Sequence, residues 1–305
     1  PKRAGGPWDL GHRRVAAAVR QAAAVLCLNP NDAACLLPLV DDPGRIVDFP
    51  PFINVAPYRE AARRRAEARA GIAAALALPE HAVWLLAVGM MRAGDKAASY
   101  AALATAIRRL DADLPDWRLI VVGDGPARAT VEAGLQAAAP GRVVFAGALD
   151  EAALARYYAA ADVMAWPSVN EAFGMALLEA QASGLPAVAG DVGGVSAVVA
   201  RGESGILTPA GDHAAFAAAL DALVRDPDRR RAYGVAGARR GQGGHARHAR
   251  RVRPRVSNVA ARRRCARVQP GRHVETAARR SVRAGRALSV LRPRPVAAVA
   301  VGHPV

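Results

Sequence analysis

Residues 163–190 read VMAWPSVNEAFGMALLEAQASGLPAVAG, and this stretch decides the fold. It predicts an apolar strand at 163–167, a polar loop, a helix over 174–183 and a second apolar strand at 186–190. Both strand runs are continuously apolar, as expected for strands that helices cover on both faces. Strand–helix–strand units of this kind build parallel sheets.

The same alternation extends from residue 82 to residue 240. We expect further strands at 83–89, 118–123, 142–147 and 205–209, and further helices at about 95–110, 126–138, 150–161, 194–200 and 212–225. This order predicts an α/β fold with a doubly wound parallel sheet of the Rossmann type. Ligands of such sheets bind at the carboxyl ends of the strands.

The segment before residue 82 is less regular. It has strand-like runs at 23–27 and 45–49 and a short helix candidate after Asn31, and then PPFINVAP (50–57) breaks the pattern with three prolines. A helix rich in Ala, Arg and Glu follows over 57–78, with Pro57 in its first turn. We therefore divide the chain into residues 1–56, 57–240 and 241–305.

Of the net charge of +16, all but one unit lies in the last of these zones. Residues 241–305 contain 16 Arg, no Lys and one acid, Glu275, whereas residues 1–240 hold 26 basic and 25 acidic residues. The tail also lacks a sustained helical or strand period. Translation in the wrong frame after about Arg240 would explain it, and a basic tail that contacts anionic lipid or RNA is the alternative.

Length and composition favour a helix-rich α/β protein. The chain has 305 residues, 52% of them apolar and only 5% aromatic, which argues against a lectin-like β-sandwich. No run reaches the roughly 18 apolar residues of a membrane span. The chain starts at Pro1 rather than at Met and shows no signal segment, and we expect it to be a fragment. Cys27, Cys35 and Cys265 form no CxxC pair, and we expect reduced thiols and a cytoplasmic setting.

Two carboxylates frame the helix of the opening stretch. Glu171 lies in the loop before Gly174, where the helix begins, and Glu179 lies about one and a half turns into it. A helix start attracts anions, and ionised carboxylates accept hydrogen bonds from pairs of hydroxyls, as in sugar and ribose diols. The plainer alternative is that Glu171 caps the helix and that Glu179 is an exposed helix acid.

The run EAFGMALLE (171–179) resembles the E-x-F-G-x-x-x-x-E signature of the retaining glycosyltransferases of family 4, which have the GT-B fold. The resemblance implies that Glu171 contacts the transferred sugar and that Glu179 holds the ribose of the nucleotide. It also implies that the backbone of Phe173, Gly174 and Met175 faces the sugar and phosphate groups.

A second match is VGMMRAGDKAASY (88–100), which follows the first strand of the sheet. The family places an Arg and a Lys in this loop, and Arg92 and Lys96 are the positions that fit. The resemblance implies that they grip the two donor phosphates, for which a planar guanidinium and a mobile ammonium are suited. A solvated helix start with two cations is the alternative.

Three weaker matches concern loops near the nucleotide. RLIVVGDGPAR (118–128) resembles the family's strand and turn, in which Gly123 and Gly125 form a tight corner. The loop around Ala148–Leu149 corresponds to one that lies against the base. SGLPAVAGDVGGVSAVV (183–199) carries Gly193 and Gly194, which would let the backbone approach the donor. The family often has a Glu shortly after this pair, where this chain has Ser196 and Ala197.

We expect neither a metal nor a bound cofactor, because the nucleotide-diphosphate sugar is itself the donor substrate. Asp111-Ala112-Asp113 resembles a metal-binding pair but sits in a connection after a helix, where a polar loop is expected. No His/Cys cluster has metal-ligand spacing. The absence of a G-x-G-x-x-G motif disfavours a nicotinamide dehydrogenase.

Taken over residues 20–240, the resemblance implies a hexosyltransferase-type enzyme that transfers a sugar to an acceptor hydroxyl with retention. Residues 1–56 would be the end of a truncated acceptor-side domain and residues 57–240 the donor-binding half, so that the fragment alone is expected to be inactive. The acceptor would be a glycan or a lipid-linked group, with peripheral association at the inner membrane face and no specific nucleic acid. The other readings are a nucleotide-sugar epimerase of GT-B fold and a basic-tailed protein that binds anions or nucleic acid.

Overall fold

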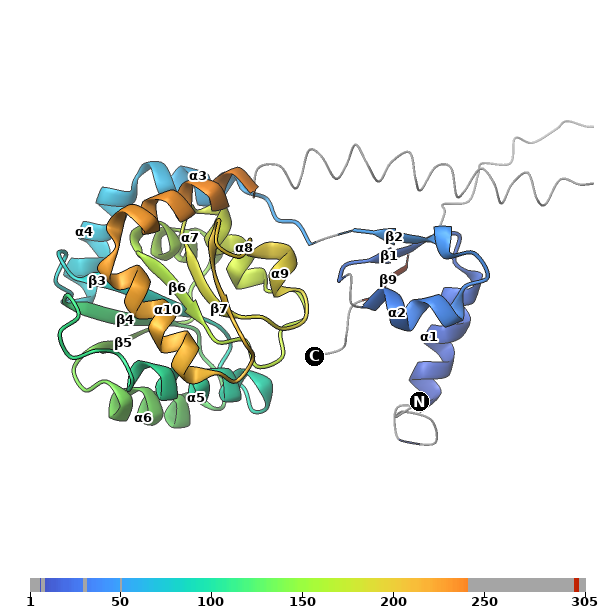
Figure 1. Ribbon diagram of the computed structural model, residues 1–305, viewed down its shortest axis with the longest axis horizontal. Coiled ribbons are helices and arrows are strands. Elements are labelled where there is room, and N and C mark those ends of the chain that lie inside the picture. Colours follow the sequence, from blue (N-terminus) through green and yellow to red (C-terminus); the bar gives the residue numbers. More distant parts are fainter. Residues whose placement is uncertain (1–5, 7–8, 30–31, 50, 241–298, 302–305) are drawn as a thin grey trace, which may run out of the picture. The chain divides into compact units, whose positions relative to one another are not determined.

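The computed structural model describes residues 6, 9–29, 32–49, 51–240 and 299–301. The chain divides into two compact units, which are treated separately here (Figure 1). Unit 1 contains most of the described residues up to Asp48 and the strand at 299–301. Unit 2 contains the described residues from Phe49 to Arg240, and the short stretch at residues 28–29 also belongs to it. The predicted tail at 241–298 and 302–305 lies outside the described residues, so its interpretation stays a prediction.

Unit 1 is a small parallel sheet with short helices. Its elements are α1 (Asp9–Gln21), β1 (Val25–Cys27), α2 (Ala33–Leu36), the 3-10 turns η2 (Leu37–Leu39) and η3 (Pro43–Arg45), β2 (Ile46–Asp48) and β9 (Val299–Val301). The strand order is β2-β1-β9, with both pairings parallel. Val19 and Val25 are fully buried in its core. The predicted strands and the helix after Asn31 are present, whereas α1 was not predicted.

Unit 2 contains the predicted alternation of strands and helices. Its elements are α3 (Ala56–Arg63), α4 (Arg65–Leu76), β3 (Val83–Val88), α5 (Asp95–Ile107), β4 (Trp117–Val122), α6 (Arg128–Ala138), β5 (Val143–Gly147), α7 (Glu151–Ala160), β6 (Val163–Trp166), α8 (Met175–Ala182), β7 (Ala187–Gly190), α9 (Val195–Val198), β8 (Gly205–Thr208) and α10 (His213–Arg225). Residues 227–240 are also helical. The predicted six strands are therefore confirmed.

The sheet of unit 2 is parallel, with the order β5-β4-β3-β6-β7-β8. From β3 the chain moves outward to β4 and β5, then returns to β6 beside β3 and moves the other way to β8. The switch point of this doubly wound sheet is therefore the β3–β6 pair, whose paired residues include Leu85 with Val163. Crevices at the carboxyl ends of strands at a switch point are where such sheets bind ligands.

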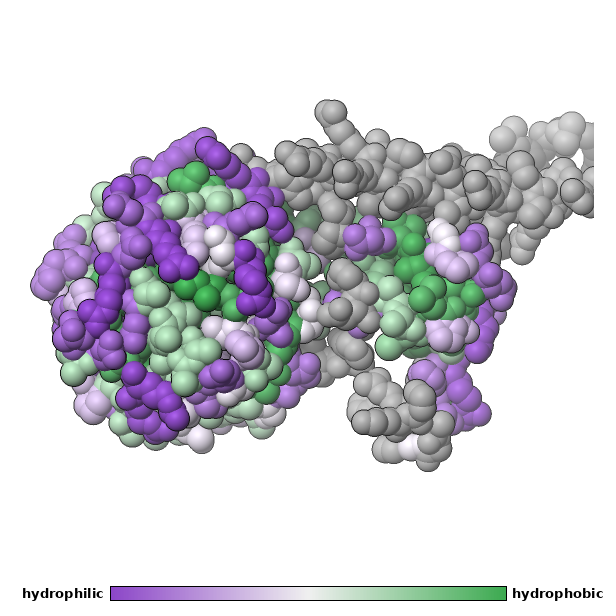
Figure 2. Space-filling view, viewed as in Figure 1, coloured by the Kyte–Doolittle hydropathy of each residue, from purple (hydrophilic) through white to green (hydrophobic). Residues whose placement is uncertain are grey.

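Helices cover both faces of this sheet (Figure 1). Helices α5, α6 and α10 pack side by side in one layer, and α3, α4, α7 and α8 pack in the other. Because both faces are covered, Leu85, Leu86 and Ala87 of β3 are fully buried. Burying a leucine side chain stabilises the fold by about 1.5–3 kcal/mol relative to exposure. Figure 2 shows hydrophilic residues spread over much of the visible face of this unit.

The single helix expected over 57–78 is wrong in detail, because the structure has two helices. The break falls at Arg64, whose backbone leaves the helical region with φ −105° and ψ 25°. After the break, Arg65 and Arg69 of α4 reach the carboxylate of Asp162, at 2.6 Å and 3.0 Å. A contact to a residue almost a hundred positions away leaves no local signal in the sequence.

Candidate functional site

A cavity of about 480 Å³ lies at the carboxyl edge of the sheet, at the switch point. Residues that follow β3, β4, β5 and β6 contribute to its lining, as does the first part of α8. The lining residues are Val88, Gly89, Met90, Lys96, Val122, Gly123, Asp124, Ala148, Leu149, Leu154, Trp166, Glu171, Met175, Ala176 and Glu179. We call it the donor cavity. It combines apolar walls with three carboxylates, of Asp124, Glu171 and Glu179, and one ammonium group, of Lys96.

Lys96 and Glu171 are paired with each other across the donor cavity. The Lys96 Nζ lies 2.8 Å from Glu171 Oε2, and the two side chains are only 20% and 16% exposed. Trp166 Nε1 donates a hydrogen bond to the same carboxylate oxygen at 3.2 Å. Lys96 also lies over the Trp166 ring, 5.4 Å from its centroid. The pair fixes a positive and a negative group at the point where β3 and β6 end.

The Glu179 carboxylate accepts a hydrogen bond from a buried tyrosine. The Tyr158 hydroxyl donates a hydrogen bond to Glu179 Oε2 at 2.8 Å, and Tyr158 itself is fully buried. Burial raises the pKa of Glu179, the hydrogen bond from Tyr158 opposes this, and the charge of Glu151 adds to it. Tyr58 also forms a hydrogen bond with this carboxylate. An ionised carboxylate offers about four acceptor positions, so Glu179 can still accept hydrogen bonds from a ligand.

The loop between β6 and α8 is shaped by glycines. Gly174 precedes α8 in the left-handed region, with φ +67°, and so turns the chain from the Glu171 loop into the helix. Gly193 has φ +53°, and a Cβ at this position would stand 2.0 Å from the Glu171 carbonyl oxygen. Gly194 donates its N–H to the same oxygen at 3.3 Å. The Gly193–Gly194 turn therefore supports the backbone of the Glu171 loop.

We expect Gly193→Ala to destabilise the protein by about 2–3 kcal/mol, because it adds a clash to the cost of a left-handed residue. Urea unfolding measures the change. Gly211→Ala is the matched control, since Gly211 has a similar φ of +75° but nothing within 4 Å of its would-be Cβ. The clash is refuted if the two substitutions cost the same.

The structure brings together part of the residue set expected from the sequence. Lys96, Gly123, Glu171, Met175 and Glu179 line the donor cavity, together with Ala148 and Leu149. Arg92, Gly125, Phe173, Gly174, Gly193 and Gly194 are not among its lining residues, and their roles toward a donor stay predictions. The Arg92 side chain is half-buried and forms no hydrogen bond or ion pair with the described residues.

Two site residues were missed from the sequence. Trp166 ends strand β6 and Tyr158 lies in α7, so both read as core residues. Their burial hides the fact that Trp166 donates a hydrogen bond to Glu171 and Tyr158 donates one to Glu179. A signal existed for Trp166, because it stands five residues before Glu171 at the carboxyl end of its strand.

The Asp111-Ala112-Asp113 pair forms the polar loop expected of it. Arg225 Nη2 lies 3.0 Å from an Asp111 oxygen and 2.6 Å from an Asp113 oxygen. Within the described residues, no three His, Cys, Asp or Glu side chains are grouped so as to hold a metal ion. None of the described helices combines the length and apolar character that crossing a membrane requires.

These features define an α/β domain with a mostly parallel, Rossmann-like sheet and a cavity at its switch point. Residues 82–226 match the family model of the glycosyl transferases group 1. The match begins at β3 and ends just after α10, so it contains every residue that lines the donor cavity. It supports assignment of unit 2 to a group 1 glycosyltransferase.

Curated relatives point the same way. The chain is 35% identical over 196 residues to the D-inositol 3-phosphate glycosyltransferase of Salinispora tropica, covering 62% of this chain and 41% of the relative. It is 37% identical over 218 residues to the enzyme of that name from Kineococcus radiotolerans, covering 66% and 49%. The chain thus spans about half the length of the curated relatives it matches.

Solved structures confirm the fold. Sucrose-phosphate synthase from Thermosynechococcus elongatus aligns with a TM-score of 0.70 and 27% identity, over 86% of this chain and 64% of that one. Anabaena HepE, solved in complex with UDP and glucose, aligns with a TM-score of 0.61 over 85% and 66%, at 17% identity. The predicted fold class, an α/β parallel sheet like those of GT-B glycosyltransferases, is confirmed.

Proposed function

We propose that unit 2 is the donor-binding half of a retaining, family 4 glycosyltransferase of the hexosyltransferase type. The observation that carries the proposal is the donor cavity, in which Lys96 and Glu171 meet at the switch point and Glu179 stands on α8. The cavity would hold a nucleotide-diphosphate sugar. Its apolar side at Ala148 and Leu149 offers a surface for the base.

Each polar group of the cavity suits one part of such a donor. Glu179 keeps acceptor positions beside those used by Tyr158 and Tyr58, and these would accept from the ribose hydroxyls. Glu171 would accept from the transferred sugar. Lys96 and the nearby Arg92 would bind the diphosphate, with help from the amides at the start of α8. Lys96 donates a hydrogen bond to Glu171. The residue that would hold the sugar and the residue that would hold its leaving phosphate are therefore in direct contact.

The proposed reaction moves the sugar to an acceptor hydroxyl that attacks from the face the nucleotide leaves. Negative charge then builds on the departing diphosphate, and fixed cations that face this charge lower the barrier. We propose that Lys96 and Arg92 supply the cations and that the reaction needs no metal. The acceptor would be a glycan or a lipid-linked hydroxyl, met at the cytoplasmic membrane face.

The direct test is a calorimetric titration of the full chain with UDP, GDP and ADP. We expect one of them to bind, and we expect Glu179→Gln to weaken it about 10-fold, because a carboxylate acceptor for the ribose is lost. Glu203→Gln is the matched control, since Glu203 is exposed and lies outside the donor cavity. Equal affinity in wild type and Glu179→Gln contradicts the ribose role.

Binding should also depend on pH through Glu179. Because burial raises its pKa above the ordinary 4.5, the carboxylate takes up a proton at a higher pH than an exposed glutamate does. A neutral carboxyl accepts hydrogen bonds poorly, so affinity should fall as the pH is lowered through this raised pKa.

The phosphate of the nucleotide titrates too, and the Glu179→Gln variant separates the two effects. In that variant only the phosphate contributes, so the difference between the two pH curves isolates Glu179. Parallel curves for wild type and variant would show that Glu179 does not titrate with binding.

A further inference from the structure

A second cavity, of about 530 Å³, lies at the opposite edge of the sheet, where β6 and β7 begin. It is formed by the start of α4, the turns that lead into β6 and β7, and the helical residues 227–240. Its lining residues are Ala62, Arg65, Ala159, Ala161, Asp162, Ser183, Gly184, Pro186, Pro227, Arg230, Arg231, Gly234, Val235 and Ala238. We call it the arginine cavity. The donor site makes no use of it.

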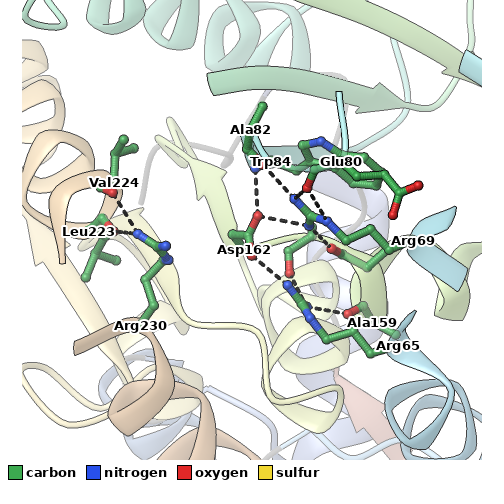
Figure 3. Close-up of polar contacts among 12 residues, drawn as sticks. Arg65, Arg69, Glu80, Ala82, Trp84, Ala159, Asp162, Leu223, Val224 and Arg230 are labelled. Atoms are coloured by element: carbon green, nitrogen blue, oxygen red, sulfur yellow. Dashed lines mark hydrogen bonds and ion pairs between the residues drawn. The ribbon is translucent and has the colours of Figure 1, made fainter. Parts of the chain in front are cut away.

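The charge of the arginine cavity is unbalanced. Three guanidinium groups line it, from Arg65, Arg230 and Arg231, but only one carboxylate, Asp162. That carboxylate is already used: Arg65 Nη2 lies 2.6 Å from one oxygen, and Arg69 Nη1 and the Trp84 N–H lie 3.0 Å and 2.8 Å from the other. Asp162 is therefore neutralised by the Arg65–Arg69 side of the cavity (Figure 3).

Arg230 lies across the arginine cavity from this cluster, and no carboxylate of the part of the chain that the structure describes forms an ion pair with it. Figure 3 shows it apart from Asp162, with its guanidinium turned to the backbone of α10. Its Nη1 donates to the carbonyl oxygens of Leu223 and Val224, at 2.5 Å and 2.7 Å, and among the described residues it forms no salt bridge. Burial lowers the pKa of Arg230, and the charge of Asp162 only partly opposes this.

Capping of helix C-termini explains part of the arginine arrangement but not all of it. Cations stabilise helix C-termini, and Arg65 and Arg230 do bind the last carbonyl oxygens of α7 and α10. A guanidinium has five N–H donors, however, and the hydrogen bonds of Arg230 to the described residues use only Nη1. Ser183, which also lines the cavity, has a buried hydroxyl without a hydrogen-bond partner among the described residues. Donors and positive charge are left over.

We propose that the arginine cavity binds a phosphate-type oxyanion between Arg230, Arg231 and Arg65. Guanidinium groups recognise phosphate oxygens through paired N–H donors, and a half-buried cation whose nearby carboxylates, Asp162 and Asp226, form no salt bridge with it is stabilised by such a ligand. The phosphate could belong to a small soluble molecule or to a lipid headgroup, and the chemistry of recognition is the same. This site is independent of the donor cavity at the other edge of the sheet.

The test is a titration of the full chain with inorganic phosphate at constant ionic strength. We expect saturable binding that Arg230→Gln weakens about 10-fold or more and Arg231→Gln at least about 3-fold. Arg231→Gln should leave the protein folded, because Arg231 is 76% exposed and its ion pair among the described residues is with the exposed Asp228. A loss of phosphate binding in this variant therefore cannot be ascribed to misfolding. Arg64→Gln is the matched control, since Arg64 adjoins Arg65 but does not line the cavity.

Two comparisons decide the outcome. The arginines of residues 241–305 are the same in every variant, so binding that all variants share equally would be non-specific attraction and would overturn the proposal. Binding lost in Lys96→Ala but kept in Arg230→Gln and Arg231→Gln would place the anion in the donor cavity and would also overturn it. Retention in Lys96→Ala with loss in the two arginine variants supports it.

A second arm identifies the source of the phosphate. Sedimentation with phosphatidylglycerol vesicles is compared with phosphatidylcholine vesicles, for wild type and for Arg231→Gln. A drop in binding to the anionic vesicles that is specific to Arg231→Gln, relative to Arg64→Gln, indicates a lipid headgroup. Equal vesicle binding of these variants, beside weakened phosphate binding, indicates a soluble phosphate compound.

Discussion

Replacing Asp162 with alanine is expected to lower the free energy of unfolding by about 3–5 kcal/mol. Asp162 is only 15% exposed and holds Arg65, the equally buried Arg69 and the Trp84 N–H at once. Removing one partner of a buried ion pair leaves uncompensated charge in a medium that solvates it poorly. In this case two guanidinium groups lose their carboxylate partner and keep only backbone carbonyl acceptors, and the Trp84 N–H loses its acceptor. Urea unfolding of the full chain measures the loss.

Asp228→Ala is the matched control for this substitution. Asp228 also pairs with an arginine, Arg231, but the two side chains are 84% and 76% exposed. Exposed pairs contribute at most about 1 kcal/mol, so this variant should unfold almost like the wild type. If the two aspartate variants lose the same stability, the contacts of Asp162 with Arg65, Arg69 and the Trp84 N–H do not stabilise the packing of α4 on the sheet.

Replacing Lys96 with alanine is expected to weaken binding of the preferred nucleoside diphosphate by about 2–4 kcal/mol, roughly 30- to 1,000-fold in Kd. Two effects act in the same direction. The phosphates lose a cation, and the Glu171 carboxylate, 2.8 Å from Lys96 in the structure, is left as an unpaired negative charge beside them. Binding of the nucleoside without phosphates should change much less.

Calorimetry of the nucleoside diphosphate and of the nucleoside measures both parts of this prediction. Arg108→Ala is the control, because it removes one positive charge just beyond the far end of α5 without touching the donor cavity. If Lys96→Ala binds the nucleoside diphosphate as well as the wild type does, Lys96 is not a phosphate ligand. Equal weakening of both compounds would mean that the substitution disturbs the base pocket instead.

The sheet of unit 2 could be predicted from sequence because its strands carry their own signal. Runs such as VWLLAV in β3 and LIVV in β4 are apolar throughout, and the structure buries them on both faces of the sheet. Helix α1 was not predicted because only two of its residues, Ala16 and Val19, are buried, so it carries a weak apolar pattern. The break at Arg64 was not predicted because no Gly or Pro marks it, and the contacts that Arg65 and Arg69 make with Asp162 after it are tertiary ones.

The candidate site was predictable where the fold itself brings residues together. Lys96 follows β3 and Glu171 follows β6, and these adjacent parallel strands end at the same edge, so their side chains meet. The support of the site was not predictable. Nothing in the spacing of Tyr158 and Glu179 shows that a core tyrosine donates to the carboxylate. The arginine cavity was likewise hidden, because it gathers side chains from four separate segments.

The central claim is that the donor cavity of unit 2 binds a nucleoside diphosphate. Hydrogen exchange of the full chain, with and without saturating UDP, GDP or ADP, tests it most directly because it reports where binding occurs. We predict that one nucleotide slows exchange at residues 88–96, 122–125, 148–154 and 171–179, and leaves residues 201–204 and 227–240 unchanged. Exchange that none of the three nucleotides slows in those four segments would contradict the claim.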